Sequence, residues 1–262
     1  MKSFVAVVFG SLVFFLPSAI AFAQGMPQIP ESLATEKTDE QKYNEEVRRQ
    51  RDPAVALREA RVLKEGLLAP SDADRVAFAE FLHTRNTGLI RLLPRELYDS
   101  EVYHTANPSR IRGGGSYYSF INLTHVYGYG SDIGLEQNHL MVGFAGAAYG
   151  MLTNLGDVWI EGITLTDPRA NFLSSYEPPT LEPEARAEAQ RFGVREGVTI
   201  DGLVYQRRLP VQENTTYLLR SIDYDRSDVL VALRVVKKDS DGSIIIAWKL
   251  LKEYRPPMLK RS

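Results

Sequence analysis

The residues best suited to acid–base or metal chemistry are two histidines and two carboxylates that lie close together in the chain: His125, Asp132, Glu136 and His139. An imidazole titrates near neutral pH, and a carboxylate can orient it or exchange a proton through it, so such a pair could serve a hydrolase. The same groups could bind a metal ion if their strands paired, but their spacing matches no established ligand pattern such as His-Glu-x-x-His. We therefore predict no metal site and keep the four residues as candidate catalytic groups.

Tyrosines interleaved with glycines surround these polar residues: Tyr117, Tyr118, Tyr127 and Tyr129. A tyrosine offers a large flat surface with a polar tip, which suits recognition of a sugar, an apolar small molecule or a protein. The alternative is that the rings pack over a sheet and cover neighbouring glycines. Because glycines, aromatic rings and two histidines coincide between residues 110 and 164, we predict that ligand binding occurs there, through these four tyrosines.

Three further motifs resemble known sites, and each lacks an essential part. The glycines at 113–115 are followed by neither a helix nor a Lys-Ser/Thr pair, so they predict a tight turn rather than a phosphate loop. The serine in segment 130–134 stands one position too early for a nucleophile elbow. Segment 239–243 has its glycine too early for a calcium loop, and Leu250 stands where that loop needs a glutamate. We predict no cofactor.

Composition narrows the class of protein. The chain has 262 residues, a formal net charge of −2 and 44% hydrophobic residues, which is typical of a globular protein with a substantial core. The near-neutral charge gives no electrostatic reason to expect a nucleic acid partner. The chain has no cysteine, so it uses neither thiol chemistry nor disulfides.

The N-terminus has the pattern of an export signal. Lys2 supplies a positive charge, residues 4–15 form an apolar run, and Ala21-Phe22-Ala23 has the small-x-small form of a cleavage site. An uncleaved membrane anchor is the alternative, but the run is short and is soon followed by Pro17. We expect removal of residues 1–23 and a bacterial periplasmic or secreted protein without a transmembrane segment.

The elements that position these groups change type along the chain. Capping patterns predict helices at 38–51 and 53–66, and a third that begins with a capping box of Ser71 and Asp74. The third helix would place Val76, Ala77, Phe81 and Leu82 on one side. Segment 89–93 is apolar and stops before Pro94, so it could be a buried strand or a helical turn. A short helix is predicted at 181–192.

Most of the remaining chain has the pattern of strands. We predict them at 116–122, 133–136, 140–144, 158–163, 198–206, 216–224, 229–238 and 243–252, with Gln137-Asn138-His139 as the turn of a hairpin. A two-residue turn at Asp241-Gly242 would place Val235 opposite Trp248 and Leu233 opposite Leu250, which gives one apolar face.

Together these patterns predict an α+β fold: N-terminal helices followed by a largely antiparallel β-sandwich or incomplete β-barrel with one inserted short helix. The expected divisions are a signal peptide at 1–23, a flexible lead-in at 24–37, a helical region at 38–98, a β-rich domain at 99–255 and a C-terminal tail at 256–262.

Three functions fit this sequence. The leading hypothesis is an exported, non-catalytic module that binds a small molecule, a glycan or a protein through the tyrosine-rich surface. The first alternative is a periplasmic or secreted hydrolase that uses His125 or His139 with Asp132 or Glu136. The second alternative is a structural protein of the cell envelope.

Overall fold

The computed structural model describes residues 66–98, 115–144, 146 and 148–260, and these form an α+β fold dominated by antiparallel strands. The five-stranded sheet, called sheet A here, has the order β1 (Thr87–Leu92), β11 (Ile244–Tyr254), β10 (Ser227–Lys238), β9 (Thr215–Asp223) and β5 (Tyr149–Gly156). Sheet B has the order β2 (Tyr117–Tyr118), β3 (Ile133–Glu136), β4 (His139–Met141) and β8 (Arg208–Pro210). A separate hairpin joins β6 (Val198–Ile200) to β7 (Leu203–Tyr205). The sequence-based prediction of an α+β fold with a sandwich of antiparallel sheets is confirmed.

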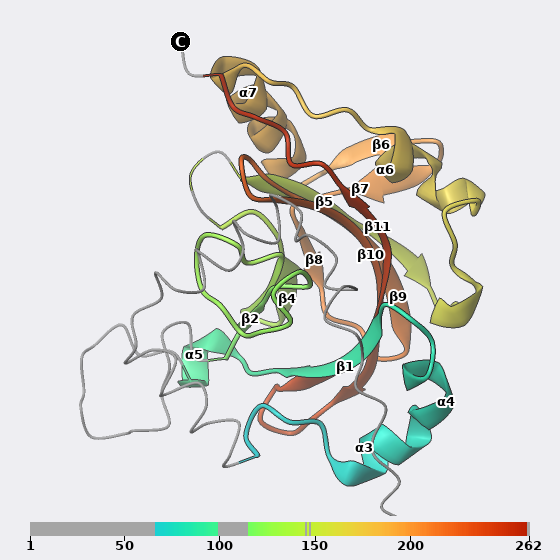
Figure 1. Cartoon of the computed structure of the whole chain (residues 1–262). Coiled ribbons are helices and arrows are strands. Elements are labelled where there is room, and N and C mark those ends of the chain that lie inside the picture. The colour runs from blue at the N-terminus through green and yellow to red at the C-terminus, as the bar shows by residue number, and fades with distance from the viewer. Residues whose placement is uncertain (1–65, 99–114, 145, 147, 261–262) are drawn as a thin grey trace, which may run out of the picture. The chain divides into compact units, whose positions relative to one another are not determined.

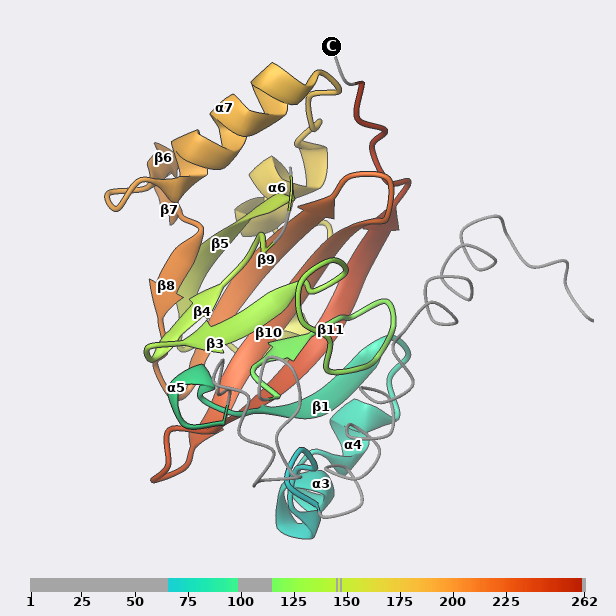
Figure 2. The ribbon, with the colours of Figure 1, turned by 90° about the vertical axis from the view of Figure 1, so that its left-hand side faces the viewer.

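Sheet B lies over one face of sheet A, and an apolar core fills the space between them (Figure 2). Sheet A contributes alternate residues of its strands, such as Leu219, Val231 and Ile246, as the two-residue period of a strand requires. Sheet B contributes Leu135 and Leu140 from its central hairpin. The region between 116 and 142 is therefore fixed largely by burial against sheet A.

The opposite face of sheet A is covered by helices and by the β6–β7 hairpin (Figure 1). The helical elements of the described residues are α3 (Asp72–Ala77), α4 (Ala79–Leu82), α5 (Arg95–Tyr98), η2 (Ile160–Gly162), η3 (Pro168–Ala170), α6 (Asn171–Ser175) and α7 (Glu182–Gly193). Of these, α5 instead contacts β3 of sheet B. Leu173 of α6 and Phe192 of α7 pack against Leu218 and Leu230 of sheet A. Both faces of sheet A are thus covered, which explains why β9 and β10 are almost continuously buried.

Strand β1 forms the edge of sheet A beside β11. Gly88 pairs with Trp248, whose ring lies so close that a Cβ atom on residue 88 would approach it to 2.5 Å. Glycine is therefore required at this position by close packing. Segment 89–93, for which the sequence allowed a strand or a helical turn, is a strand through Leu92.

The helical predictions have mixed outcomes. The capping box of Ser71 and Asp74 is present at the start of α3, and α7 lies where a helix was predicted. The α3 helix ends at Ala77, however, and Val76 is 77% exposed, so the predicted apolar side is wrong there: only Phe81 is buried, in α4. The helices predicted at 38–51 and 53–66 lie outside the described residues.

The hairpin of β10 and β11 is present, but its predicted register is wrong by two residues. Leu233, rather than Val235, lies opposite Trp248, and Val231 lies opposite Leu250. The turn is longer than the assumed Asp241-Gly242 pair, because the Asp239 N–H donates to the Ser243 carbonyl. A register shift between Val235 and Lys237 accompanies it. The side-chain faces are nevertheless as predicted, because a shift of two residues preserves the alternation.

Two predicted strands are wrong. Segment 158–163 contains the 3₁₀ helix η2, in which Ile160 and Ile163 are buried and Trp159 is 67% exposed; that spacing of three follows a turn rather than a strand. Segment 198–206 is a hairpin, because Asp201 and Gly202 both take positive φ angles and form a tight turn. The eight-residue strand β5 was not predicted, nor was α6.

Candidate functional site

A pocket of about 190 Å³ opens onto the glycine- and tyrosine-rich stretch. Leu89 and Ile90 both line it, although successive side chains of a strand point to opposite faces of the sheet. The pocket therefore lies at the edge of β1, and we call it the β1-edge pocket. Its lining residues are Leu68, Ala69, Pro70, Arg75, Leu89, Ile90, Tyr118, Leu123, Thr124 and His125.

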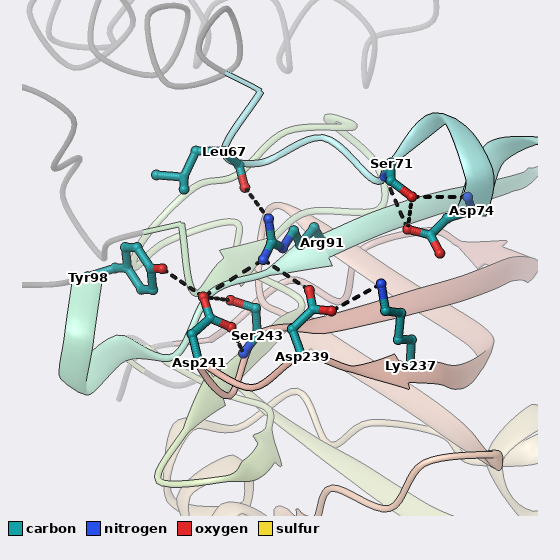
Figure 3. Close-up of polar contacts among 9 residues, drawn as sticks. All are labelled: Leu67, Ser71, Asp74, Arg91, Tyr98, Lys237, Asp239, Asp241 and Ser243. Carbon is teal, nitrogen blue, oxygen red and sulfur yellow. Dashed lines mark hydrogen bonds and ion pairs between the residues drawn. The ribbon is translucent and has the colours of Figure 1, made fainter.

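Arg91 of β1 holds the chain at Leu67, directly before the pocket wall formed by residues 68–75 (Figure 3). Its guanidinium donates to the carbonyl of Leu67 at 3.5 Å and forms an ion pair with Asp239 at 3.0 Å. Asp241 lies 3.8 Å from the same guanidinium and accepts a hydrogen bond from the Tyr98 hydroxyl at 2.7 Å. One arginine thus ties the N-terminal wall of the pocket to β1 and to the β10–β11 turn.

Apolar packing holds the same wall from the other side. Leu68 and Leu93 form a small buried cluster, and Gly115 lies directly against both. Gly115 has a φ of +74°, and a Cβ atom there would approach the Leu68 side chain to 2.5 Å. The last glycine of the predicted tight turn is therefore required both by its backbone conformation and by close packing.

His125 forms part of the inner wall as a neutral imidazole. Burial lowers the pKa of His125 to about 4, with a small opposing effect from its hydrogen bond to the Arg91 carbonyl. Because a carbonyl can only accept, the His125 Nε2–H donates this bond, at 2.8 Å. The neutral ring consequently keeps Nδ1 as an acceptor.

Tyr118 packs beside His125, with their ring centroids 5.2 Å apart in an edge-to-face arrangement. Burial, with a smaller contribution from the negative charge of Asp132, raises the pKa of the Tyr118 hydroxyl. The pocket therefore presents apolar surface together with uncharged polar groups, and Arg75 is the charged residue among those that line it. This lining suits a small uncharged ligand.

The four predicted ligand-binding tyrosines do not converge on one surface. Tyr118 reaches the β1-edge pocket, whereas Tyr117 is buried and its hydroxyl donates to Glu136. Tyr127 packs edge-to-face on Tyr117 with centroids 4.8 Å apart. Tyr129 is 56% exposed, and the Arg226 guanidinium lies 4.1 Å from its ring centroid.

Of the predicted histidine–carboxylate groups, only Glu136 and His139 are neighbours, as cross-strand partners in the β3–β4 hairpin, and their side chains bind different groups. Glu136 forms an ion pair with Arg95 at 3.2 Å, and the His139 Nδ1–H donates to the Gln137 carbonyl at 2.6 Å. His125 is bound to Arg91, and Asp132 accepts the Phe120 N–H at 2.7 Å. In the described part of the chain, no hydrogen bond or ion pair joins either histidine to either carboxylate.

Asp132 occupies a buried polar cluster between the two sheets. Burial raises its pKa to about 7, while the Phe120 N–H and the hydroxyls of Ser221 and Ser119 favour the charged form. Asp223 lies close enough for its charge to raise the Asp132 pKa further, and burial raises the pKa of Asp223 as well. Asp132 does not line the β1-edge pocket, but its N–H donates to the carbonyl of Tyr118, which does, at 2.9 Å.

Sequence reasoning identified only part of the pocket. Tyr118 and His125 were named from residue type and local composition, but the opposite wall comes from residues 68–75, outside the tyrosine-rich stretch. The one signal that could have pointed to this wall is the glycine at position 115, because a larger residue there would collide with Leu68. Pairing two such distant segments from a single sequence requires knowledge of the β1–β11 register.

Two general features of the described residues bear on the class of site. Among them, no group of three or more histidine or carboxylate side chains is arranged to bind a metal ion. None of the helices described is both long enough and apolar enough to cross a bilayer.

Comparisons with known proteins give little further information. No protein-family model matches the chain, and no curated protein matches it. A solved structure from Bacteroides fragilis, described as a "putative lipoprotein", resembles it with 14% sequence identity. The match covers 66% of this chain and 95% of that protein, with a TM-score of 0.28. A similarity of this size carries no argument about function.

Proposed function

We propose that this chain is an exported, non-catalytic binding protein whose β1-edge pocket receives a small, mainly apolar and uncharged group. The observation that carries the proposal is that this pocket opens onto Tyr118 and His125, within the stretch for which the sequence predicts ligand binding. The aromatic ring of Tyr118 offers contact area, and the neutral imidazole of His125 offers a hydrogen-bond acceptor.

The size of the pocket limits what it can bind. Pockets for drug-sized ligands usually have volumes of about 300–1,000 Å³, whereas this one has about 190 Å³. A ligand with a short branched or cyclic apolar part therefore fits better than an oligosaccharide or a nucleotide. Tyr129, which is exposed, is the predicted tyrosine best placed to contact a larger partner outside the pocket.

Export and the division into regions belong to the same proposal. They rest on the signal pattern at 1–23 and on the change from helical to strand patterns along the sequence. Strand β1 lies within the region 38–98 that the sequence assigns to helices, yet it pairs with β11. The helical region and the β-rich domain therefore share sheet A.

A pocket-filling variant tests the binding role. Ala69 is half-buried in the pocket wall, and its N–H donates to the Gly66 carbonyl, a bond that a new side chain leaves intact. We expect cyclohexanol and isovaleramide to shift the Thr124 and His125 amide signals of the wild type in ¹H–¹⁵N NMR spectra. The Ala69→Phe variant should weaken this binding at least tenfold.

Ala77→Phe is the matched control, because Ala77 is exposed at the end of α3 and does not line the pocket. It should bind both probes as the wild type does. Absence of any probe-induced shift in the wild-type protein, or equal binding by the Ala69→Phe variant, would refute the proposed pocket function.

A further inference from the structure

Among the described strands, β1 pairs with β11 on one side only, and the alternation of its hydrogen bonds shows which residues face the other side. Gly88, Ile90 and Leu92 pair with Trp248, Ile246 and Ile244 of β11 in register. The Leu250 N–H donates to the Asn86 carbonyl, so the even-numbered residues direct their backbone groups toward β11. The odd-numbered residues consequently direct theirs away from the sheet.

Two contacts on the outer side agree with this parity. The Arg91 carbonyl accepts from His125, and the Leu93 N–H donates to the Gly115 carbonyl at 3.2 Å. These contacts close the outer side of β1 from Arg91 onward. They also show how this edge is protected, since an unpaired strand edge is a ready template for another extended chain.

These contacts leave two outward-facing residues of β1 open, Thr87 and Leu89, and of these Leu89 lies at the pocket. Its N–H and C=O have no hydrogen-bond partner in the part of the chain that the structure describes. Leu89 also lines the β1-edge pocket. One wall of the pocket therefore carries an unused backbone donor and an unused backbone acceptor, spaced as in a strand.

We propose that the β1-edge pocket binds an extended peptide segment, which pairs with the Leu89 backbone and places one apolar side chain among Leu68, Tyr118 and His125. This inference rests on the proposed binding function and specifies its ligand class. The pocket holds a single side chain, and the adjacent backbone groups match the donor and acceptor that every peptide unit offers. The capped edge at Arg91 restricts the pairing to a short stretch, so the affinity of an isolated peptide is modest.

The probe that tests this inference is a blocked tripeptide, acetyl-Ala-Leu-Ala-methylamide. On binding, the Leu89 amide proton should move downfield and its exchange with solvent should slow, because it gains a hydrogen bond. The matched control is the same peptide with its leucine nitrogen methylated, which keeps the side chain but removes one backbone donor. We expect it to bind roughly tenfold more weakly, the effect of losing one backbone hydrogen bond at a buried acceptor.

A variant of the protein tests the same pairing from the other side. Leu89→Pro removes the outward N–H without removing a bond to β11, and proline is tolerated on edge strands whose N–H faces outward. Ile90→Pro is the contrasting variant, because it removes an N–H that pairs with β11 and should destabilise the sheet. Because Leu89 also lines the pocket, Leu89→Pro should weaken the binding of cyclohexanol to some extent, but it should weaken the binding of the blocked tripeptide more, since only the peptide pairs with the Leu89 N–H.

The outcomes separate this inference from the proposed function. Equal binding of the methylated and unmethylated peptides, with cyclohexanol still bound, would overturn peptide pairing and leave the pocket function standing. A Leu89 amide that is already protected from exchange in the free protein, whether by its own chain or in a dimer, would also overturn it. Loss of both peptide and cyclohexanol binding would instead refute the proposed function.

Discussion

At the scale of single residues, two buried groups near the loop after β2 give opposite dependences of stability on pH. Burial raises the pKa of Asp132 from 3.8 to about 7, so the folded state holds a proton that the unfolded chain releases near pH 4. The contribution of Asp132 to the free energy of unfolding is therefore largest below about pH 4 and is lost as the pH rises to about 7. Burial lowers the pKa of His125 from 6.5 to about 4, so its contribution is lost as the pH falls through the same range.

Substitution at each position should remove its contribution to the dependence of the free energy of unfolding on pH. Asp132→Asn should gain stability relative to the wild type as the pH rises from 4 to 8, by at most about 4 kcal/mol, since each pKa unit corresponds to about 1.4 kcal/mol. His125→Gln should lose stability relative to the wild type as the pH rises from 4 to 7, by at most about 3 kcal/mol. Urea unfolding at several pH values measures both effects.

Two variants at other positions control for the substitutions themselves. Asp201→Asn changes an exposed turn residue with a φ of +50°, a conformation that asparagine readily adopts, and His139→Gln changes a half-buried residue of β4. Parallel stability curves for Asp132→Asn and the wild type between pH 4 and 8 would show that Asp132 ionises in the folded protein as it does in the unfolded chain.

At the scale of elements, α6 is attached to sheet A by buried polar groups, which the pattern of apolar residues along the strands did not predict. Arg220 of β9 forms two hydrogen bonds with Asp228 of β10, at 2.6 and 2.8 Å, and also donates to the Leu173 carbonyl of α6. The Tyr254 hydroxyl donates to the adjacent Ser174 carbonyl at 2.9 Å, and its ring centroid lies 3.5 Å from the arginine guanidinium carbon. A cation at the C-terminal end of a helix is also favourable electrostatically.

Removing one member of this buried ion pair should be more harmful than removing both. Arg220→Met leaves the Asp228 carboxylate buried without its cation, and we expect a loss of about 3–5 kcal/mol in the free energy of unfolding. The double variant Arg220→Met/Asp228→Leu should recover a substantial part of that loss, because no uncompensated charge remains. Guanidinium unfolding followed by tryptophan fluorescence measures the cycle, and strictly additive effects of the two substitutions would contradict the coupling.

Sequence patterns predicted the elements of sheet A better than their pairing. Strands β10 and β11 are long and mostly apolar, and β9 has an apolar run at 217–219, so their positions followed from the pattern of apolar residues. Their register did not, because it depends on a turn at 239–243 that is longer than the Asp241-Gly242 pair suggests. Strand β5 was not predicted because its glycines and its asparagine interrupt the alternation of apolar and polar residues that is typical of a strand. At the pocket, residue type identified Tyr118 and His125 but gave no indication of the wall at 68–75.

At the scale of the whole molecule, the described residues explain how a chain without cysteine builds a stable core. Sheet A is covered on both faces, by sheet B on one and by helices and a hairpin on the other. Such double burial replaces the covalent cross-links that many exported proteins use. The same architecture places the β1-edge pocket at a margin of sheet A, where a ligand can reach it without opening either core.

Export itself is the prediction that belongs to this scale. If residues 1–23 form a cleaved signal, expression of the full chain in a bacterial host should give a periplasmic protein whose first residue is Gln24, as mass spectrometry of the intact protein would show. Ala23→Phe should block this cleavage, because the position before the cut requires a small side chain. Phe22→Leu should be processed normally, since the intervening position is not restricted in this way. Full-length protein retained in the cytoplasm in all three cases would contradict export and would remove the extracellular ligand from the proposed function.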